Sequence, residues 1–441
     1  MTSVLRIFSA FMVAIFCTTL ASAQQEETMR LSLFQALEMA LTRHVDVIIA
    51  NERVEQALAR IQENSSPLLP QLKGSVSETR QTRDLRSAGI PLPGDPLVGP
   101  FNVYDARVRL TQTIFDPGAF TRFKSSQQGR VLSLAQQKKT QEDVLVLVSA
   151  LFIDAKRAQD SFVVSQASLR RDKKEMSIVF SRFRSGLGSP LEMKKARTKY
   201  AHALYNTETA RKQALESRLD LAAALDLPQD QKVQFVWDEQ LLAKQIPSGL
   251  SAEDQPDVKV AREQLKLNKK DRSANKWDFW PKVSVSGDYG PSGVTPSDSS
   301  ETYSLGVAAS IPIFEGGMRQ AKLKESESAV KISEAQLQSV QRHVQAKVST
   351  QQATVAQAEA LVKENENNVA VAEEEARLVR SQFNAGNGSP LDVTSAELNL
   401  KIAQDQKDEA LAYYMMAKIN FARALGHVEQ FLLEKNNRGA N

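Results

Sequence analysis

Two stretches of this chain, 200 residues apart (383 − 183 = 200), nearly repeat each other. The first runs Phe183-Arg-Ser-Gly-Leu-Gly-Ser-Pro-Leu-Glu192 and the second runs Phe383-Asn-Ala-Gly-Asn-Gly-Ser-Pro-Leu-Asp392. In each, the first glycine suits the left-handed cap that ends a helix, and the Ser-Pro pair suits the N-cap and first position of the next helix. The repeat therefore predicts two helical hairpins with the same tight tip. The tip residues are Gly186, Leu187, Gly188, Ser189 and Pro190 in the first copy, and Gly386, Asn387, Gly388, Ser389 and Pro390 in the second.

The first residues have the pattern of an export signal. An apolar run from Ile7 to Leu20 is followed by the small residues Ala21-Ser22-Ala23, so residues 1–23 are predicted to be a cleaved signal peptide. The alternative, a membrane anchor, is less favoured because the run is shorter than the ~20 residues of a spanning helix. Cys17 is the only cysteine, and it follows Phe16, where a lipoprotein signal would need a small residue. We therefore expect no lipid at Cys17.

Long helical segments fill most of the remaining chain. Helices are expected over residues 31–64, 119–185, 190–225, 256–277, 318–385 and 390–426. The segment before each tip approaches 70 residues and would be ~100 Å long, whereas each return helix is about half of that. We therefore expect each return helix to stack end to end with helix 31–64 or helix 256–277. Apolar residues spaced by seven line the long helices, which predicts coiled-coil packing: Val148, Ala155, Phe162, Leu169, Met176 and Phe183, then Val348, Val355, Val362, Val369, Ala376 and Phe383.

Four short segments alternate between apolar and polar residues, as half-exposed strands do. They lie near residues 72–76, 104–110, 283–289 and 303–311, with loops expected at 89–100 and 290–300. Segments of about ten residues with one apolar face are typical of outer-membrane barrel strands, and four of them are too few to close a barrel of ~8 strands. A small soluble sheet is the alternative. In a barrel, the lumen would receive Asp105, Arg107 and Arg109, and the lipid would receive Tyr104, Ala106 and Val108.

The order of these segments divides the chain into two similar halves. The predicted fold class is mixed α and β, with long antiparallel coiled-coil hairpins and four β-strands in two internal repeats. The expected boundaries are the signal peptide 1–23, the first repeat 24–227, a connecting segment 228–255, the second repeat 256–426 and a polar C-terminal tail 427–441.

The sequence contains no pattern of catalytic or cofactor-binding residues. His44, His202, His343 and His427 are scattered without paired metal-ligand spacing. The Gly-x-Gly of each tip lacks the strand-to-helix context of a phosphate-binding loop. Without Arg6 of the signal peptide, the chain has 55 basic and 52 acidic residues, which does not favour nucleic-acid binding. We predict a non-enzyme with no cofactor and no metal.

Several motifs together resemble the TolC family of outer-membrane efflux and secretion channels. They are the start Leu31-Ser-Leu-Phe-Gln-Ala-Leu-Glu-Met-Ala-Leu41, the strand exits Ile114-Phe-Asp-Pro-Gly118 and Ile313-Phe-Glu-Gly-Gly317, and the two tips. The resemblance implies a homotrimer in the outer membrane of a Gram-negative bacterium. Its three chains of four strands would share a 12-stranded transmembrane barrel, continued by a helical tunnel (α-barrel) through the periplasm.

The same resemblance implies partners and a gate. The tips would dock onto a periplasmic adaptor (membrane fusion protein) joined to an inner-membrane transporter, making the trimer the passive exit duct of an efflux pump or type I secretion system. Asp392 matches an acid that lines the periplasmic gate in this family, and Ser395 replaces the second one. Glu192 is the first-repeat counterpart of Asp392 and is expected mainly to complement the helix dipole. The cargo is left open among drugs, metal ions and polypeptides. A periplasmic coiled-coil scaffold or adhesin without a pore is the alternative function.

Overall fold

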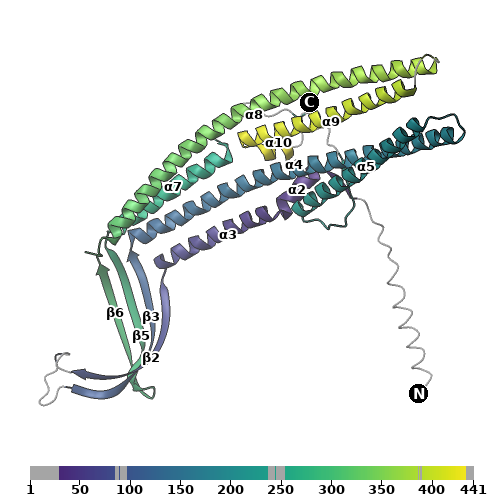
Figure 1. Cartoon of the computed structure of the whole chain (residues 1–441). Helices are drawn as coiled ribbons and strands as arrows, with labels where there is room; N and C mark the ends of the chain where they lie inside the picture. Colours follow the sequence, from purple (N-terminus) through teal and green to yellow (C-terminus); the bar gives the residue numbers. More distant parts are fainter. Residues whose placement is uncertain are drawn as a thin grey trace, which may run out of the picture.

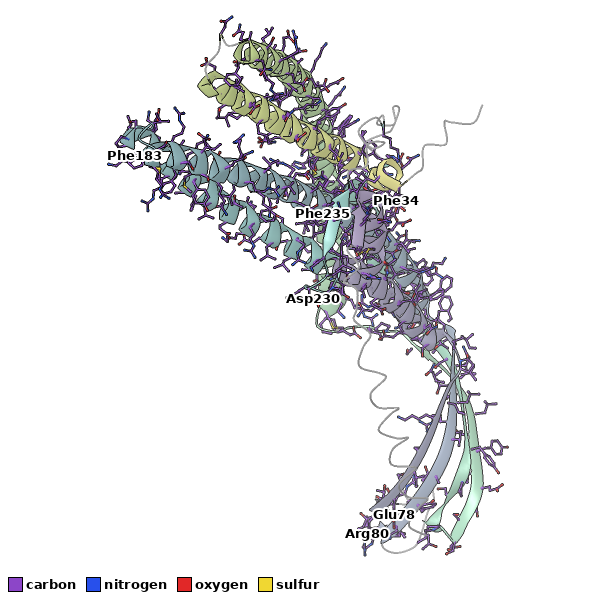
Figure 2. All side chains as sticks on the ribbon, turned by 90° about the vertical axis from the view of Figure 1, so that its right-hand side faces the viewer. Phe34, Glu78, Arg80, Phe183, Asp230 and Phe235 are labelled. Atoms are coloured by element: carbon purple, nitrogen blue, oxygen red, sulfur yellow. The ribbon has the colours of Figure 1, made fainter. Side chains whose placement is uncertain are left out.

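The molecule is elongated, with a β-sheet at one end and two helical hairpins at the other (Figure 1). This computed structural model describes residues 29–84, 89, 97–236, 244, 254–385, 387 and 390–433. The predicted signal peptide, residues 1–23, lies outside this set, as do residues 434–441. Figure 2 places Glu78 and Arg80 at the sheet end and Phe183 at the far end of the first hairpin. The first predicted tip therefore lies at the opposite end of the described chain from the sheet.

The sheet has four antiparallel strands in the order β2-β3-β5-β6. They are β2 (Gln71–Asp84), β3 (Leu97–Phe115), β5 (Lys282–Thr295) and β6 (Asp298–Ser310). All four predicted strands are present, but the predicted loop 290–300 is wrong. Pairing continues through Gly293↔Ser299 to Thr295↔Asp298. Glycine, proline and serine there indicated a loop, whereas the backbone ladder with the neighbouring strand determines where the hairpin turns.

Four helices rise from the sheet in the same order as the strands (Figure 1). They are α3 (Val45–Ser65), α4 (Pro117–Arg184), α7 (Pro256–Trp277) and α8 (Met318–Asn384). Contacts join α3 to α4, α4 to α7 and α7 to α8. Because α3 leads into β2, and β6 leads into α8, the outermost helices stand over the outermost strands. No helix among the described residues is both long enough and apolar enough to cross a membrane.

The two long helices run without interruption from the sheet to the tips. α4 has 68 residues and α8 has 67. At ~1.5 Å per residue each is ~100 Å long. α4 starts at Pro117, where the Asp116 carboxylate accepts a hydrogen bond from the amide of Ala119 at 2.9 Å. The return helices α5 (Pro190–Ala224) and α9 (Pro390–Leu425) pack on α4 and α8 respectively.

Each return helix ends at mid-height, where another helix begins. At the end of α9, Gly426 has φ +78°, and a Cβ there would lie 2.6 Å from Cδ of Pro256, the first residue of α7. Glycine is required here both for the left-handed backbone and for this close approach. The expected end-to-end stacking of residues 390–425 on residues 256–277 is therefore present.

Two expectations near the chain ends are wrong. Residues 31–64 are not one helix: β1 (Met29–Ser32) is followed by α2 (Leu33–Arg43), and His44, in extended conformation, separates α2 from α3. β1 pairs in parallel with β4 (Val233–Val236), so the apolar run in the connecting segment is a strand. Residues 427–441 are not simply a polar tail, because α10 (Val428–Leu433) buries Val428, Phe431 and Leu432.

The hydrophobic core lies at mid-height, where these short elements surround α4. Phe152 of α4 is fully buried and meets Phe235 of β4 edge to face, with ring centroids 5.6 Å apart. Leu31 of β1 and Phe431 of α10 are buried in the same cluster. The core therefore holds both halves of the chain together around a single helix.

Candidate functional site

The first tip has the geometry that its sequence predicts. Gly186 has φ +75°, and its amide donates to the Phe183 carbonyl at 3.1 Å. The amide of Leu187 donates to the Arg182 carbonyl at 2.9 Å, which completes the helix C-cap. A Cβ on Gly188 would lie 2.8 Å from the Phe183 nitrogen, so a side chain there would disturb the turn. Leu187 itself is 77% exposed at the end of the molecule.

The second tip shares the part of this geometry that lies in the described residues. The amide of Asn387 donates to the Gln382 carbonyl at 3.0 Å, which is the Leu187–Arg182 hydrogen bond moved by 200 residues. α8 ends at Asn384 and α9 begins at Pro390. Gly386, Gly388 and Ser389 lie outside the described residues. Their assignment as docking residues stays a prediction, as it does for the first tip.

The two acids beyond the tips occupy the first turns of the return helices. The Glu192 carboxylate accepts a hydrogen bond from the Ser189 amide at 3.3 Å, while the Ser189 hydroxyl accepts from the Leu191 amide at 3.2 Å. This is a reciprocal capping box, which gives Glu192 a structural role at the start of α5. Asp392 is exposed in the first turn of α9, and Ser395 is exposed nearby. Their gating roles stay predictions.

The polar face of the sheet carries a network of charged side chains across three strands. The Arg107 guanidinium donates to Asp105 at 2.7 Å and to Asp288 on β5 at 2.5 Å. Arg109 approaches Asp288 at 3.7 Å. Asp288 also accepts from the Ser304 hydroxyl of β6 at 2.7 Å. The predicted residues Asp105, Arg107 and Arg109 therefore lie together on one face.

The opposite face of the sheet is apolar. Val108 pairs in register with Tyr289, which pairs with Tyr303. Val108 is 51% exposed and Tyr303 is 81% exposed, whereas Asp288 on the other face has only 10% of its side chain exposed. Exposed apolar side chains on this scale indicate a surface that contacts lipid or another protein. At the helix end of this sheet, Trp277 and Trp280 pack together with ring centroids 5.1 Å apart.

A buried charge cluster at mid-height was not predicted from the sequence. Arg423 near the end of α9 contacts Asp143 of α4 at 2.7 Å and Asp257 of α7 at 3.2 Å. Lys139 of α4 contacts Asp257 at 2.5 Å. Glu142, only 1% exposed, lies 3.9 Å from Arg423. The one available signal was an arginine within the mostly apolar stretch Ile419 to Leu425, because charged residues are rarely buried without partners.

Burial and neighbouring charges set the ionisation of this cluster. Burial raises the pKa of Glu142 to about 7, although Arg423 and Lys138 oppose the change. Burial also acts to raise the pKa of Asp257, but hydrogen bonds from Lys139 and Gln255 and the charge of Arg423 lower it to about 2. Glu142 is therefore the member of the cluster that titrates near neutral pH.

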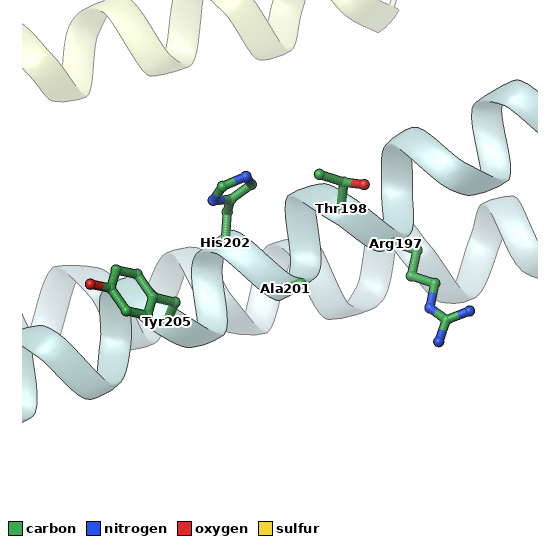
Figure 3. Close-up of a pocket in the computed structure, with 5 residues that line it drawn as sticks. All are labelled: Arg197, Thr198, Ala201, His202 and Tyr205. Carbon is green, nitrogen blue, oxygen red and sulfur yellow. The ribbon is translucent and has the colours of Figure 1, made fainter.

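A surface hollow on α5 offers no enclosed site. Figure 3 shows its lining, which consists of Arg197, Thr198, Ala201, His202 and Tyr205. All five residues belong to the same helix, so no second element closes the hollow over a ligand. In the described part of the chain, no group of three or more His, Cys, Asp or Glu side chains is placed to hold a metal ion.

Comparison with known proteins identifies the family. Residues 36–226 and 249–427 match the family described as outer membrane efflux protein. Outer membrane protein TolC of Escherichia coli K12 is 24% identical over 408 residues, covering 87% of this chain and 80% of TolC. The proteases secretion protein PrtF of Dickeya chrysanthemi is 19% identical over 438 residues, covering 95% of this chain and 93% of PrtF.

Solved structures share the fold. The Campylobacter jejuni CmeC outer membrane channel superposes with a TM-score of 0.75 at 15% identity, over 90% of this chain and 86% of CmeC. The outer membrane protein VceC of Vibrio cholerae gives a TM-score of 0.71 at 16% identity, over 90% and 96% of the two chains. The resemblance drawn from the sequence motifs is confirmed, and the alternative of a scaffold or adhesin without a pore is not supported. This chain belongs to the outer membrane efflux protein family and is an outer-membrane channel protein.

Proposed function

We propose that three copies of this chain form a passive duct through the outer membrane and periplasm, the exit of a tripartite efflux pump or type I secretion system. The observation that carries this proposal is the two-faced sheet. Its exposed apolar face suits lipid, and its charged face suits a water-filled lumen. β2 and β6 stand at opposite edges of the sheet, and strand edges are not tolerated in lipid. Three sheets joined edge to edge would close a 12-stranded barrel (3 × 4 = 12).

The tips support docking to a periplasmic adaptor and, through it, an inner-membrane transporter. They lie at the end of the molecule opposite the sheet (Figure 2), and Leu187 there is exposed. Both secretion and efflux proteins occur among the relatives, in PrtF and in the toluene efflux pump protein TtgI of Pseudomonas putida. The proposal needs no cofactor and no catalytic step, because the energy for transport would come from the pump.

Planar-bilayer recording tests the duct directly. Detergent-extracted protein reconstituted from outer membranes should give unitary conductance steps and migrate as a trimer before heating. The same preparation from cells that lack the gene is the control. A protein that fractionates as a soluble periplasmic monomer, and gives no conductance, would exclude this function.

Proline at the first tip should abolish transport without removing trimers from the membrane. Gly186 has φ +75° and uses its amide to cap α4, and proline can provide neither. Efflux of a pump substrate and crosslinking to the adaptor should both fall to the level of the deletion strain. Gly186→Asn is the matched control, because asparagine tolerates the left-handed conformation. Full efflux with Gly186→Pro would place docking elsewhere.

Neutralising Asp392 should change ion selection, whereas neutralising Glu192 should change it less. Threefold symmetry would turn Asp392 into a ring of like charges, which attracts cations in a narrow mouth. Glu192 completes the capping box of α5 by accepting from the Ser189 amide, and the family resemblance assigns the gate position to Asp392. In bilayer recordings, Asp392→Asn should lower cation selectivity and block by multivalent cations more than Glu192→Gln does. An unchanged reversal potential and unchanged block in Asp392→Asn would leave this residue as a helix cap.

A further inference from the structure

Two cations lie opposite each other on the polar face of the sheet. Lys73 of β2 and Arg109 of β3 are paired in register, so their side chains lie next to each other on the same face. Lys73 is exposed, and the side chain of Arg109 is 59% exposed. Like charges in directly opposed positions destabilise a sheet. The stability of the fold therefore does not account for this pair.

The acids beside this pair are largely occupied by another cation. Arg107 donates to Asp105 at 2.7 Å and to Asp288 at 2.5 Å. Arg109 lies 3.7 Å from Asp288, which is too long for a hydrogen bond. Among the residues that the structure describes, no acid lies within ion-pair distance of Lys73. The three cations and two acids of this network leave one positive charge in excess (3 − 2 = 1).

A neighbouring copy would bring no further acid to this face. In the proposed barrel, β2 would lie beside β6 of the next copy, because these are the two edge strands. From residue 299 to residue 314 the only charged residue is Glu301, and alternation along β6 places it on the apolar face with Tyr303. The next acid, Glu315, accepts from Arg319 of its own chain at 2.8 Å. The excess positive charge would therefore remain in the closed ring.

Threefold symmetry would gather these cations around the lumen. Each copy contributes Lys73 and Arg109, so the proposed barrel would contain a ring of six cations (3 × 2 = 6). Rings of lysine or arginine select anions in pores, and the low-dielectric wall of a barrel strengthens their field. This ring has the opposite sign to Asp392, which lies in the first turn of α9 at the other end of the molecule.

We propose that Lys73 and Arg109 form an anion-binding site inside the barrel, for the carboxylate or phosphate groups of molecules that leave through the duct. The site rests on the proposed trimeric duct. A guanidinium donates two parallel hydrogen bonds to such a group, and an ammonium adds a compact charge beside it. The same ring favours anionic over cationic cargo in the last part of the path.

Block by a polyvalent anion tests the site in planar bilayers. Citrate, as the polycarboxylate probe, and pyrophosphate, as the phosphate probe, should each reduce the unitary current of the wild-type trimer. The combined Lys73→Gln and Arg109→Gln variant should need about tenfold more of either anion for the same block, because the field that concentrates anions is lost. Block of the wild type should also weaken as KCl rises from ~0.1 M to ~1 M. Equal block of the wild type and the double variant would overturn the site.

The exchanged variant, Lys73→Arg with Arg109→Lys, is the matched control because it keeps both charges. It should be blocked as the wild type is, and a loss of block to the level of the glutamine variant would overturn a site built on charge. A wild-type protein that conducts ions but is blocked by neither anion would overturn the site and leave the duct intact. A wild-type protein that conducts no ions would overturn the duct as well.

Trimer stability provides an independent readout. Lys73→Gln removes one of two opposed like charges, so its trimers should dissociate at a temperature no lower than that of the wild type. A residue that served only assembly would behave in the opposite way. A lower dissociation temperature would therefore show that Lys73 stabilises the trimer, and would overturn the argument from opposed charges.

Discussion

Replacing Arg423 with leucine is expected to lower the free energy of unfolding by about 1–3 kcal/mol, the usual cost of leaving a buried polar group without its partner. Arg423 has only 8% of its side chain exposed and joins Asp143 of α4 to Asp257 of α7. Its loss removes this cation from Asp143 and from the buried Glu142, whereas Asp257 keeps Lys139. Denaturant unfolding of the detergent-solubilised protein, followed by far-ultraviolet circular dichroism, measures the change.

The defect should depend on pH. Burial raises the pKa of Glu142 from 4.5 to about 7, so the folded state binds this proton more tightly than the unfolded chain does. Stability contributed by that proton is present at low pH and is lost as pH rises through about 7. Removing Arg423 removes a charge that opposes the increase, so the variant should be most defective at alkaline pH. Adding Glu142→Gln should recover part of the loss, and an equal defect at acidic and alkaline pH would contradict this account.

Replacing Val108 with arginine should lower the stability of the proposed 12-stranded barrel by about 2–4 kcal/mol, the cost of a cation facing lipid near the bilayer midplane. Val108 lies beside Tyr289 on the apolar face and has no acid in register with it. The variant should yield little trimer in outer membranes, and the trimer that forms should dissociate at a lower temperature than the wild type.

Thr111→Arg is the matched control for this prediction. Thr111 lies three residues further along β3, in register with Ser286 on the polar face. The same guanidinium there would enter the lumen and should leave assembly close to normal. If Thr111→Arg prevents assembly and Val108→Arg does not, the two faces of the sheet have been assigned the wrong way round.

Local patterns in the sequence predicted most of the helices and all four strands of the large sheet. The regular apolar spacing of α4 and the cap residues Ser189 and Pro190 of α5 can be recognised within short stretches of sequence, so these two helices could be predicted. β1 escaped prediction because its four residues pair with Val233–Val236, about two hundred residues away. Leu31 and Leu33 both fit the apolar spacing of a helix. In the structure Leu31 lies in β1 and Leu33 begins α2, with Ser32 between them as the N-cap of α2. The local spacing of apolar residues carries no information about which distant segments pair.

The candidate sites differ in the same way. The tips are built from consecutive residues, so their cap geometry could be predicted. The polar face of the sheet could also be predicted, because alternation alone places Asp105, Arg107 and Arg109 together. The mid-height cluster could not, because Glu142, Asp257 and Arg423 come from three helices. Only the folded chain brings their charges together, and burial is the largest cause of the raised pKa of Glu142.

The interruption between α9 and α7 has a mechanical consequence. α8 transmits a displacement from the tip to the sheet through continuous backbone. α9 stops at Leu425 and meets α7 through the close approach of Gly426 to Pro256 and the Arg423–Asp257 ion pair. Bending of the second hairpin should therefore concentrate at the level of Gly426, which we expect to act as a hinge. We expect bending at this level to move the tips apart while the sheet keeps its shape. The side chains at that level, above all Arg423, would determine how easily this hinge bends.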